Sequence, residues 1–300
     1  MTNTGVLSTP LRATDYVVGG ISGADRVLLR ESGDWTDLAP AYEPQSFPNY
    51  DTMACVSFSA MNCIEILEKH ATGLEPNYSD RYLARMSETG PNGNYFYLVG
   101  DALRHNGAVA EAEWPTVPTG TRSDYYASVP GPVLEVGKKW LERWRVSYEF
   151  VPVQTEDLKD LLPYGPLQIA IGNDTENVAT HAITLLKQNA DGSRMVLDHY
   201  GGSPGIFTLP PSRRIYSALR YSLTPTPMPT SLIENTLYQL VEPPGGFGLA
   251  VGGKLIVDQR WELLASFIVR NGGKLEGKVQ TITRADWDAA EKRDLKGNPV

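Results

Sequence analysis

The sequence predicts an α+β fold, with a helical first part, an antiparallel sheet after it and a small module at the end. Apolar residues recur at helical spacing in the stretch 51–70, which predicts a long buried helix. From residue 166 onward, short apolar runs alternate with turn residues, which is typical of strands. The segment 224–230 holds three prolines in seven residues and predicts a semi-rigid linker. We therefore expect one domain over residues 1–223, this linker, and a separate module over residues 231–300.

The composition is typical of globular proteins. Of the 300 residues, 41% are hydrophobic and 21% are charged, and the formal net charge is −8. No cluster of basic residues indicates nucleic-acid binding, and no apolar run is long enough to span a membrane. The first residues, MTNTGVLSTPLRATD, lack the basic and apolar regions of a signal peptide, so we expect synthesis in the cytoplasm without a signal peptide.

The predicted helix in 51–70 carries a candidate nucleophile near its start. Asp51 and Thr52 are residue types that cap helices, which places the first helical residue near Met53 and Cys55 in the first turn. The positive end of the helix dipole favours a thiolate, which is a strong nucleophile. A lone cysteine at such a place can equally be a small apolar core residue. The apolar residues that define the helix are Ala54, Val56, Phe58, Ala60, Met61, Cys63, Ile64 and Leu67.

The sequence has two cysteines, Cys55 and Cys63. Eight helical residues at about 1.5 Å each separate their Cα atoms by roughly 12 Å, which is too far for a disulfide. Both are therefore expected to be free thiols, in a chain made in a reducing compartment.

Turn and cap residues divide the rest of the first domain into short elements. Residues 34–50 predict a surface loop, because they contain three prolines and show no helical period. The expected helices cover 81–88, 95–105, 133–144 and a short stretch from a cap at Thr155 to Pro163. The expected strands cover 166–172, 181–187, 195–199, 206–209 and 215–223.

One histidine lies where a carboxylate can hold it. His181 begins an expected strand, and Asp198 lies on the strand that a hairpin turn at 189–193 pairs with it. A carboxylate beside an imidazole fixes its tautomer and raises its basicity, and an imidazole beside a cysteine takes its proton. Such a pair can also be purely structural. His199 follows Asp198 and is expected to point to the opposite face of the strand.

Four segments together resemble the papain-like cysteine peptidases. ACVSFSAMNCIE (54–65) is similar to the family's nucleophile helix, and NGNYFYLVGDALRHNGAVAEAEWP (92–115) to its Asn-Gly-Gly loop and the helix after it. GPLQIAIG (165–172) is similar to the Gly-Pro strand that precedes the catalytic histidine. HAITLLKQNADGSRMVLDHYGG (181–202) is similar to the segment from that histidine to the Asn-Ser-Trp-Gly motif. The four segments occur in the family's order, and the resemblance covers residues 35–223.

The resemblance implies a papain-like fold, cysteine peptidase or amide hydrolase activity through a thioester acyl-enzyme, and a role for each matched residue. Cys55 is the expected nucleophile, His181 its base, and Asp198 the residue that orients the histidine. Gln45 is the expected oxyanion donor together with the backbone N–H of Cys55. Asn49 is the alternative donor, because it has the family's usual offset from the cysteine.

Substrate contacts and partners follow from the same resemblance. The loop residues Asn92, Gly93 and Asn94 and the residue before the histidine, Thr180, are expected to bind substrate. The expected substrate is a peptide or a peptidoglycan peptide. No cofactor, metal ion or nucleic acid is expected to take part. No inhibitory propeptide is expected either, because the matched region already begins at residue 35.

The chain departs from the family pattern at several positions. Asp198 stands where the family has asparagine, which keeps an acceptor for the imidazole and adds a charge. The indole that shields the histidine is absent, or the Tyr200 ring replaces it. Val56 replaces the tryptophan after the nucleophile. Pro91 and Asn94 replace a cysteine and a glycine, as expected for a version without a disulfide.

The module after the linker contains no catalytic constellation in its sequence. Its expected elements are strands at 237–241 and 254–257, a helix at 260–269 and a capping box at 283–286. Such a tail indicates docking or assembly with a protein partner. Its composition, without an export signal or propeptide, is similar to that of peptidases carried in bacteriophage virions. The alternative function is a catalytically weak or inactive papain-fold structural protein of a phage particle or another assembly.

Overall fold

In the computed structural model, internal contacts divide the chain into two compact units, residues 1–224 and residues 225–300. The first unit contains helices and a six-stranded sheet, and the second contains a five-stranded sheet. That the second unit serves docking or assembly stays a prediction. The structure describes residues 5–7, 12, 15–18, 26–154, 157–173, 177–200 and 205–226, and the backbone of five short strands beyond them.

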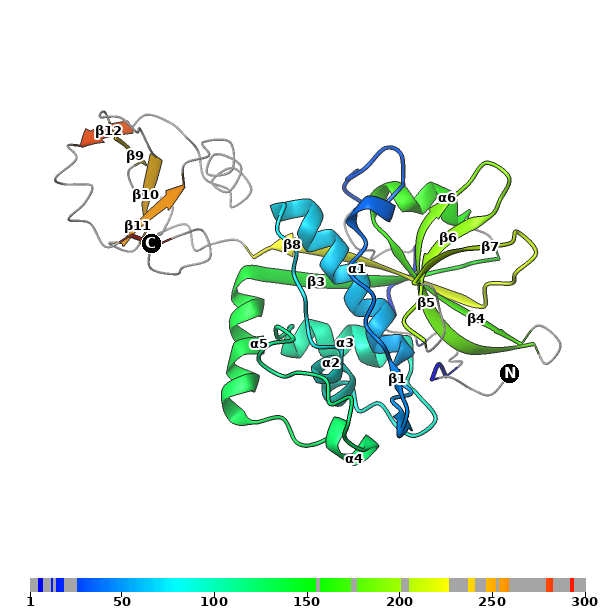
Figure 1. The fold of residues 1–300 in the computed structure, drawn as a ribbon. Coiled ribbons are helices and arrows are strands. Elements are labelled where there is room, and N and C mark those ends of the chain that lie inside the picture. The colour runs from blue at the N-terminus through cyan, green and yellow to red at the C-terminus, as the bar shows by residue number, and fades with distance from the viewer. Residues whose placement is uncertain are drawn as a thin grey trace. The chain divides into compact units, whose positions relative to one another are not determined.

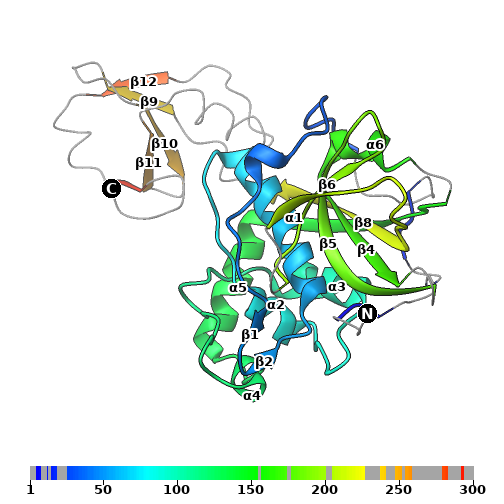
Figure 2. The same cartoon turned by 45° about the vertical axis from the view of Figure 1, so that its right-hand side comes forward.

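Helices form one half of the first unit. The longest, α1, lies between the other helices and the sheet and runs alongside strand β5 (Val178–Gln188), as Figures 1 and 2 show. The predicted helices at 81–88, 95–105 and 133–144 correspond to α2, α3 and α5. The helices are α1 (Cys55–Thr72), α2 (Asp80–Met86), α3 (Phe96–Asn106), α4 (Arg122–Tyr125) and α5 (Gly131–Arg143). Before them lie the 3-10 helix η1 (Thr36–Leu38) and a hairpin of β1 (Ser46–Phe47) and β2 (Tyr50–Asp51).

Helix α1 begins two residues later than predicted, at Cys55. Asp51 and Thr52 do not cap it: Asp51 Oδ1 accepts the N–H of Met53 at 2.8 Å, and Thr52 Oγ1 accepts the N–H of Ala54 at 3.2 Å. Met53 has a positive φ of 58°, a backbone conformation that costs about 1–3 kcal/mol for a residue with a side chain. This tight turn makes Cys55 the first helical residue, with a backbone N–H that the helix itself does not use.

The other half of the first unit is the six-stranded sheet. Its strand order is β3-β8-β4-β5-β6-β7, and the pairings from β8 to β7 are antiparallel. Together with the helical half, this is the predicted α+β fold. The strands besides β5 are β3 (Trp144–Val151), β4 (Leu167–Asn173), β6 (Arg194–Leu197), β7 (Ile206–Leu209) and β8 (Ser217–Pro225). The short helices α6 (Leu158–Leu161) and η2 (Leu162–Tyr164) precede β4.

Strand β3 is the main element that the sequence reading missed. The predicted helix at 133–144 ends at Arg143, and Trp144 already opens the strand. No turn residue separates the two elements, and the buried residues of β3 alternate only in its first half, so the period of two is short. Helix α6 is capped by Asp157, whose side chain accepts the N–H of Lys159. The predicted cap, Thr155, lies outside the described residues.

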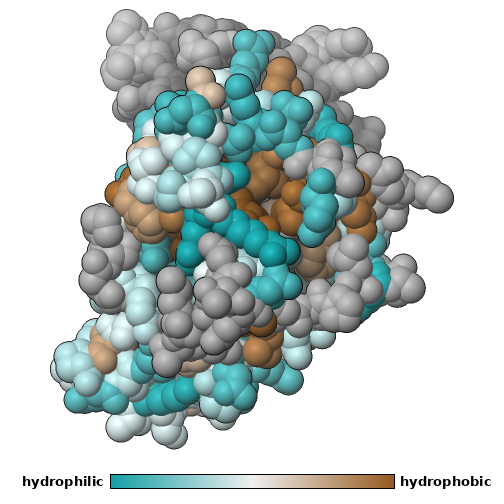
Figure 3. All heavy atoms as spheres, turned by 90° about the vertical axis from the view of Figure 1, so that its right-hand side faces the viewer, coloured by the Kyte–Doolittle hydropathy of each residue, from teal (hydrophilic) through white to brown (hydrophobic). Residues whose placement is uncertain are grey.

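The two faces of the sheet belong to two hydrophobic clusters. Alternate residues of a strand point to opposite faces. Ala170 and Ala182 belong to the cluster that contains the buried face of α1, whereas Ile169 and Ile183 belong to the cluster that contains Trp35. The small residues on the first face allow α1 to lie close to the strands. Figure 3 shows one face of the molecule, on which hydrophobic side chains gather in a hollow bordered by hydrophilic ones.

The second unit is described by the backbone of its strands. They pair in the order β12-β9-β10-β11-β13. The predicted strands at 237–241 and 254–257 correspond to β9 and β11, while the predicted helix at 260–269 and the capping box at 283–286 lie outside the described residues. The strands are β9 (Leu237–Leu240), β10 (Phe247–Val251), β11 (Lys254–Asp258), β12 (Val279–Ile282) and β13 (Lys292–Arg293). Among the described helices, none is long and apolar enough to cross a membrane.

A chain that ends at Thr226 is expected to stay folded, because every element of the first unit precedes this residue. Near-UV circular dichroism and the thermal unfolding midpoint of the first unit should match those of the full chain. A chain that ends at Tyr216 is the matched control: it removes β8, which lies between β3 and β4, and should not fold. An insoluble or unfolded protein ending at Thr226 would show that the two units depend on each other.

Candidate active site

Cys55 presents its thiol to the backbone of β5. Its Sγ accepts the N–H of Ala182 at 3.4 Å. The sulfur therefore lies beside both a backbone N–H donor and the N-terminal end of α1. The Cys55 side chain is 0% exposed, and Cys63 is also buried and free. The predicted free thiols are therefore confirmed, and the sulfur of Cys55 lies in a site that is closed to solvent.

An irregularity in the sheet sets the direction of the His181 side chain. In the pairing of β4 with β5, Ile171 lies opposite His181, but the next residue, Gly172, lies opposite Ala179, so Thr180 is an extra residue. Such a bulge redirects the side chains beside it, and bulges are common next to active sites. A Cβ at Gly172 would lie 1.9 Å from a carbonyl oxygen of β5, so a residue with a side chain does not fit there. The glycine thus permits the bulge that orients the histidine.

The His181 ring lies between a carboxylate and the thiol. Its Nε2 is 2.8 Å from Asp198 Oδ1. The other ring nitrogen, Nδ1, is buried and has no hydrogen-bond partner within normal limits among the described residues. Burial disfavours the charged ring, but the hydrogen bond to Asp198 and the nearby Cys55 outweigh burial and raise the pKa of His181 to about 10. The ring is therefore expected to be protonated at neutral pH, with Nδ1 left to exchange a proton with the thiol.

Asp198 follows the last residue of β6 and is held in its charged form. Burial opposes its ionisation, but hydrogen bonds from His181 and from the N–H of Tyr200, the latter at 3.0 Å, keep the pKa of Asp198 below its ordinary value. The Tyr200 ring lies edge-on to the His181 ring, with centroids 5.5 Å apart. Tyr200 therefore covers one side of the histidine, at the position where the resemblance implied an indole.

Of the two candidate oxyanion donors, Gln45 is buried and Asn49 is exposed. Gln45 is 1% exposed, and its Nε2 has no hydrogen-bond partner among the described residues. Its backbone is tied to both sides of the site: its N–H donates to the carbonyl of His199 at 2.9 Å, and its carbonyl accepts the Thr52 hydroxyl at 2.7 Å. Asn49 lies in the turn between β1 and β2. A buried amide donor without a partner is the feature expected of a group that waits for a ligand.

His199 is a residue whose role the sequence reading missed. Its Nε2 lies 3.1 Å from Asn62 Oδ1, and its Nδ1 lies 2.9 Å from the backbone nitrogen and 2.7 Å from the carbonyl oxygen of Glu43. Its ring lies between the rings of Tyr42 and Phe58, with centroids 5.6 and 5.5 Å away. Burial lowers the pKa of His199 to about 4, so the ring is neutral at ordinary pH. Through Glu43, this neutral ring fixes the segment that carries the buried Gln45 side chain. From the sequence, the only expectation for His199 was that its side chain points to the opposite face from Asp198.

The four residues expected to bind substrate lie in different environments. Asn92 is exposed, and Gly93 and Asn94 are buried. The Asn94 side chain does not face a groove, because its Nδ2 donates to Ser87 and Thr89 inside the protein. The Asn94 backbone instead pairs with residues 5–7, because its N–H donates to the carbonyl of Gly5 and its carbonyl accepts the N–H of Leu7, both at 2.8 Å. Thr180 is buried at the bulge beside the catalytic histidine candidate.

Polar side chains connect α1 to the sheet below the site. Gln168 Nε2 donates to the carbonyl of Val56 at 2.7 Å and lies 2.8 Å from the hydroxyl of Ser59. The Thr184 hydroxyl donates to the carbonyl of Ser59 at 3.1 Å and accepts the Asn62 amide at 3.1 Å. These contacts fix the position of α1 relative to β5, the strand that carries His181.

No group of three histidine, cysteine, aspartate or glutamate side chains in the described part of the chain could hold a metal ion. A pocket of about 270 Å³ lies in the same unit, and its lining includes Phe96, Phe150, Ala170 and Tyr216.

Comparisons with known proteins identify the fold. No family model matches the chain, and no curated protein sequence matches it. Among solved structures, xylellain, a cysteine protease from Xylella fastidiosa, is similar over 76% of this chain and 97% of its own, with a TM-score of 0.54 at 12% identity. The chain has a papain-like fold. The fold that the sequence resemblance implied is thus confirmed.

Other solved structures show weaker similarity. A recombinant stem bromelain precursor is similar over 64% of this chain and 69% of its own, with a TM-score of 0.45 and 16% identity. Digestive procathepsin L 3 from the larval midgut of Tenebrio molitor is similar over 63% of this chain and 68% of its own, with a TM-score of 0.46 and 14% identity. The 12% identity to xylellain shows the fold of this chain and does not show its activity.

The pKa of His181 is expected to lie above that of an ordinary histidine, and the pKa of His199 below it. NMR of the histidine rings should show His181 charged until the pH rises through about 10 and His199 neutral until the pH falls through about 4. An unfolded histidine titrates near 6.5. His181 therefore stabilises the fold below that pH and loses this contribution as the pH rises toward 10. His199 instead makes the fold less stable as the pH falls from 6.5 toward 4.

The variants His181→Asn and His199→Gln assign the two resonances. Unfolding measured between pH 4 and 6.5 should depend less on pH in His199→Gln than in the unchanged chain. Similar titration midpoints for both rings would contradict the charge states assigned to the site.

Proposed function

We propose that the first unit is a cysteine peptidase or related amide hydrolase. The observation that carries this proposal is the arrangement of Cys55, His181 and Asp198. The Asp198 carboxylate is hydrogen-bonded to Nε2 of His181, and Nδ1 has no other partner among the described residues and can serve the thiol. A nucleophile, a base within reach, and a third group that orients the base are the requirements of nucleophilic catalysis. The papain-like fold supports the proposal, and within it Cys55 begins α1, His181 lies on β5 and Asp198 follows β6.

The steps follow from these positions. In the resting site His181 already holds the proton given up by Cys55, and the thiolate sulfur attacks the carbonyl carbon of the substrate amide to form a tetrahedral intermediate. The negative oxygen is stabilised by Gln45 Nε2 and the backbone N–H of Cys55. The C–N bond then breaks, His181 gives its proton to the leaving amine, and a thioester remains.

Water completes the cycle. His181 accepts a proton from the water molecule that attacks the thioester, the C–S bond breaks, and the carboxylic acid product leaves. Asp198 keeps its proton-free form throughout and orients the ring, so Nδ1 faces the reacting atoms while Nε2 stays hydrogen-bonded.

The substrate class follows from the same site. We propose a peptide, either within a protein chain or in a peptidoglycan stem, because the Asn94 backbone forms a strand-like bridge with Val6 and an extended peptide can form the same pairing. The proposed role of the second unit is attachment to a protein partner, which a phage particle would provide. The separate five-stranded sheet of that unit supports independent docking.

The second candidate function is an inactive structural protein with a papain-like fold. The observation in its favour is the complete burial of Cys55. A thiol-directed epoxide separates the two proposals: an active enzyme is modified at Cys55 in a reaction that His181→Asn slows, whereas an inactive relative is not.

Replacing the nucleophile is expected to abolish hydrolysis. Cys55→Ala should remove all turnover of a peptide library and leave the fold intact, because alanine suits a helix. Cys63→Ala is the matched control: it deletes the other buried thiol of the same helix and should leave turnover within a few fold. Turnover that survives in Cys55→Ala and disappears in Cys63→Ala would overturn the assignment.

Replacing the oxyanion donor is expected to slow the chemical step. Gln45→Ala should lower kcat by about 10²–10³-fold with a smaller change in KM, as removal of one such donor does elsewhere. Asn49→Ala is the control, since this side chain is exposed in the hairpin turn. Equal kcat values for both variants, or a loss confined to Asn49→Ala, would show that the buried amide is not the donor.

A further inference from the structure

A second pocket of the first unit, with a volume of about 480 Å³, is lined by three arginines, and we call it the arginine pocket. Arg194 begins β6, and Arg213 and Arg214 lie in the loop between β7 and β8. Asp157 is the one acidic residue among the described residues that line the pocket, so these side chains leave two positive charges in excess. The whole chain has a formal net charge of −8, so the arginine pocket is a positively charged site in an acidic protein.

Arg194 has one edge of its guanidinium group without a partner. Its Nη1 donates to the carbonyls of Pro211 at 3.5 Å and Arg213 at 3.2 Å, whereas its Nε is buried and has no hydrogen-bond partner among the described residues. Burial lowers the pKa of Arg194, because the charged group is partly removed from water. A buried donor without an acceptor, on a side chain that lines a pocket, is the feature expected of a group that binds a ligand.

The acidic residue of the arginine pocket is engaged by other groups. Asp157 Oδ1 accepts the N–H of Lys159 at 3.0 Å, which caps α6, and it lies 3.4 Å from Gln188 Nε2. Asp157 attracts Arg194, but no hydrogen bond joins the two side chains. The carboxylate therefore leaves the Nε edge of Arg194 to another anion.

Arg214 adds a charge that no carboxylate in the described part of the chain neutralises. Its Nη1 donates to the side-chain oxygen of Asn177, and its guanidinium carbon lies 4.7 Å from the centroid of the Tyr216 ring. The amide and the ring are both uncharged, so they hold the side chain in place without removing its charge. A ligand in the arginine pocket thus meets positive charge from β6 and from the loop before β8.

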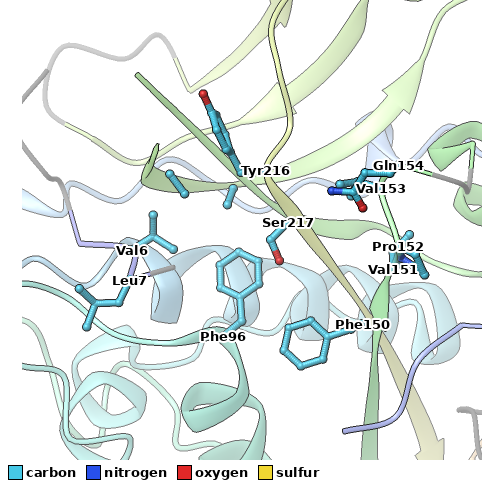
Figure 4. Close-up of a pocket in the computed structure, with 12 residues that line it drawn as sticks. Val6, Leu7, Phe96, Phe150, Val151, Pro152, Val153, Gln154, Tyr216 and Ser217 are labelled. Atoms are coloured by element: carbon cyan, nitrogen blue, oxygen red, sulfur yellow. The ribbon is translucent and has the colours of Figure 1, made fainter. Parts of the chain in front are cut away.

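The arginine pocket is separate from the proposed catalytic residues. Arg194 pairs with Gln188 in the β5–β6 ladder, and Gln188 lies seven residues after His181 on β5. At about 3.3 Å per residue, roughly 20 Å of strand separate Gln188 from His181. Val153 and Gln154 line both the arginine pocket and the pocket of about 270 Å³ shown in Figure 4. The two pockets therefore share these two residues, and the arginines line only the larger pocket.

We propose that the arginine pocket binds the phosphate group of a small phosphate monoester. Such a group carries about −1.5 to −2 charges at neutral pH, which matches the two positive charges in excess, and its oxygens accept hydrogen bonds from guanidinium groups. A carboxylate would supply only one negative charge. Val153, Leu158 and Ile215 provide apolar surface for the organic part of the molecule, and the volume lies in the range of about 300–1,000 Å³ that is usual for small-molecule sites. The phosphate site does not depend on the proposed peptidase function.

Isothermal titration calorimetry of the full chain with phenyl phosphate tests this site. One molecule should bind per chain, and Arg194→Gln should weaken binding by about tenfold or more, because hydrogen bonds to a charged group are lost. Arg214→Gln should weaken binding by a smaller factor, because it removes charge alone. Arg145→Gln is the matched control: it makes the same change of charge at an exposed arginine of β3 and should leave the affinity unchanged.

NMR of the arginine Nε–H groups in the unchanged chain gives a second measurement that does not depend on the folding of Arg194→Gln. Phenyl phosphate should shift the resonance of Arg194, which Arg194→Lys assigns, and should leave that of Arg145 in place. Absence of both heat and shift at millimolar phenyl phosphate would overturn the proposal, and so would equal affinities in Arg194→Gln and Arg145→Gln. Benzoate, which carries one negative charge, should bind more weakly than phenyl phosphate, and equal binding of the two would reject a phosphate monoester as the ligand.

Discussion

The contact between α1 and the sheet is the constraint on which the site depends. Cys55 lies on the helix and His181 on β5, and no local link in the chain fixes the distance between them. Two buried donors on the sheet, Gln168 Nε2 and the Thr184 hydroxyl, bond to carbonyl oxygens of α1. Leaving such a group unpaired costs about 1–3 kcal/mol, so the helix cannot slide or rotate freely over the strands. Apolar contacts alone would allow α1 to shift over the strands. Proton transfer between Cys55 and His181 requires a closer alignment than such shifts would preserve.

The site also depends on keeping two nearby histidines in different charge states. Asp198 accepts hydrogen bonds from the His181 ring and from the N–H of Tyr200, whereas burial keeps the adjacent His199 ring neutral. The same neutral ring uses Nδ1 to hold the Glu43 backbone and, through its own carbonyl, the backbone of Gln45. His199, the residue after Asp198, thus positions Gln45, the proposed oxyanion donor.

The local parts of this arrangement could be predicted from the sequence, whereas its long-range parts could not. The apolar period of α1 and the hairpin at 189–193 were enough to place Cys55 in a first turn and His181 near Asp198. A reading of local patterns contains no information on the bulge at Thr180 or on the buried ion pair of Arg220 with Glu149, which joins β8 to the unforeseen strand β3. The residues that meet in the ion pair lie far apart in the chain. No periodicity or motif around either residue indicates which residue it pairs with.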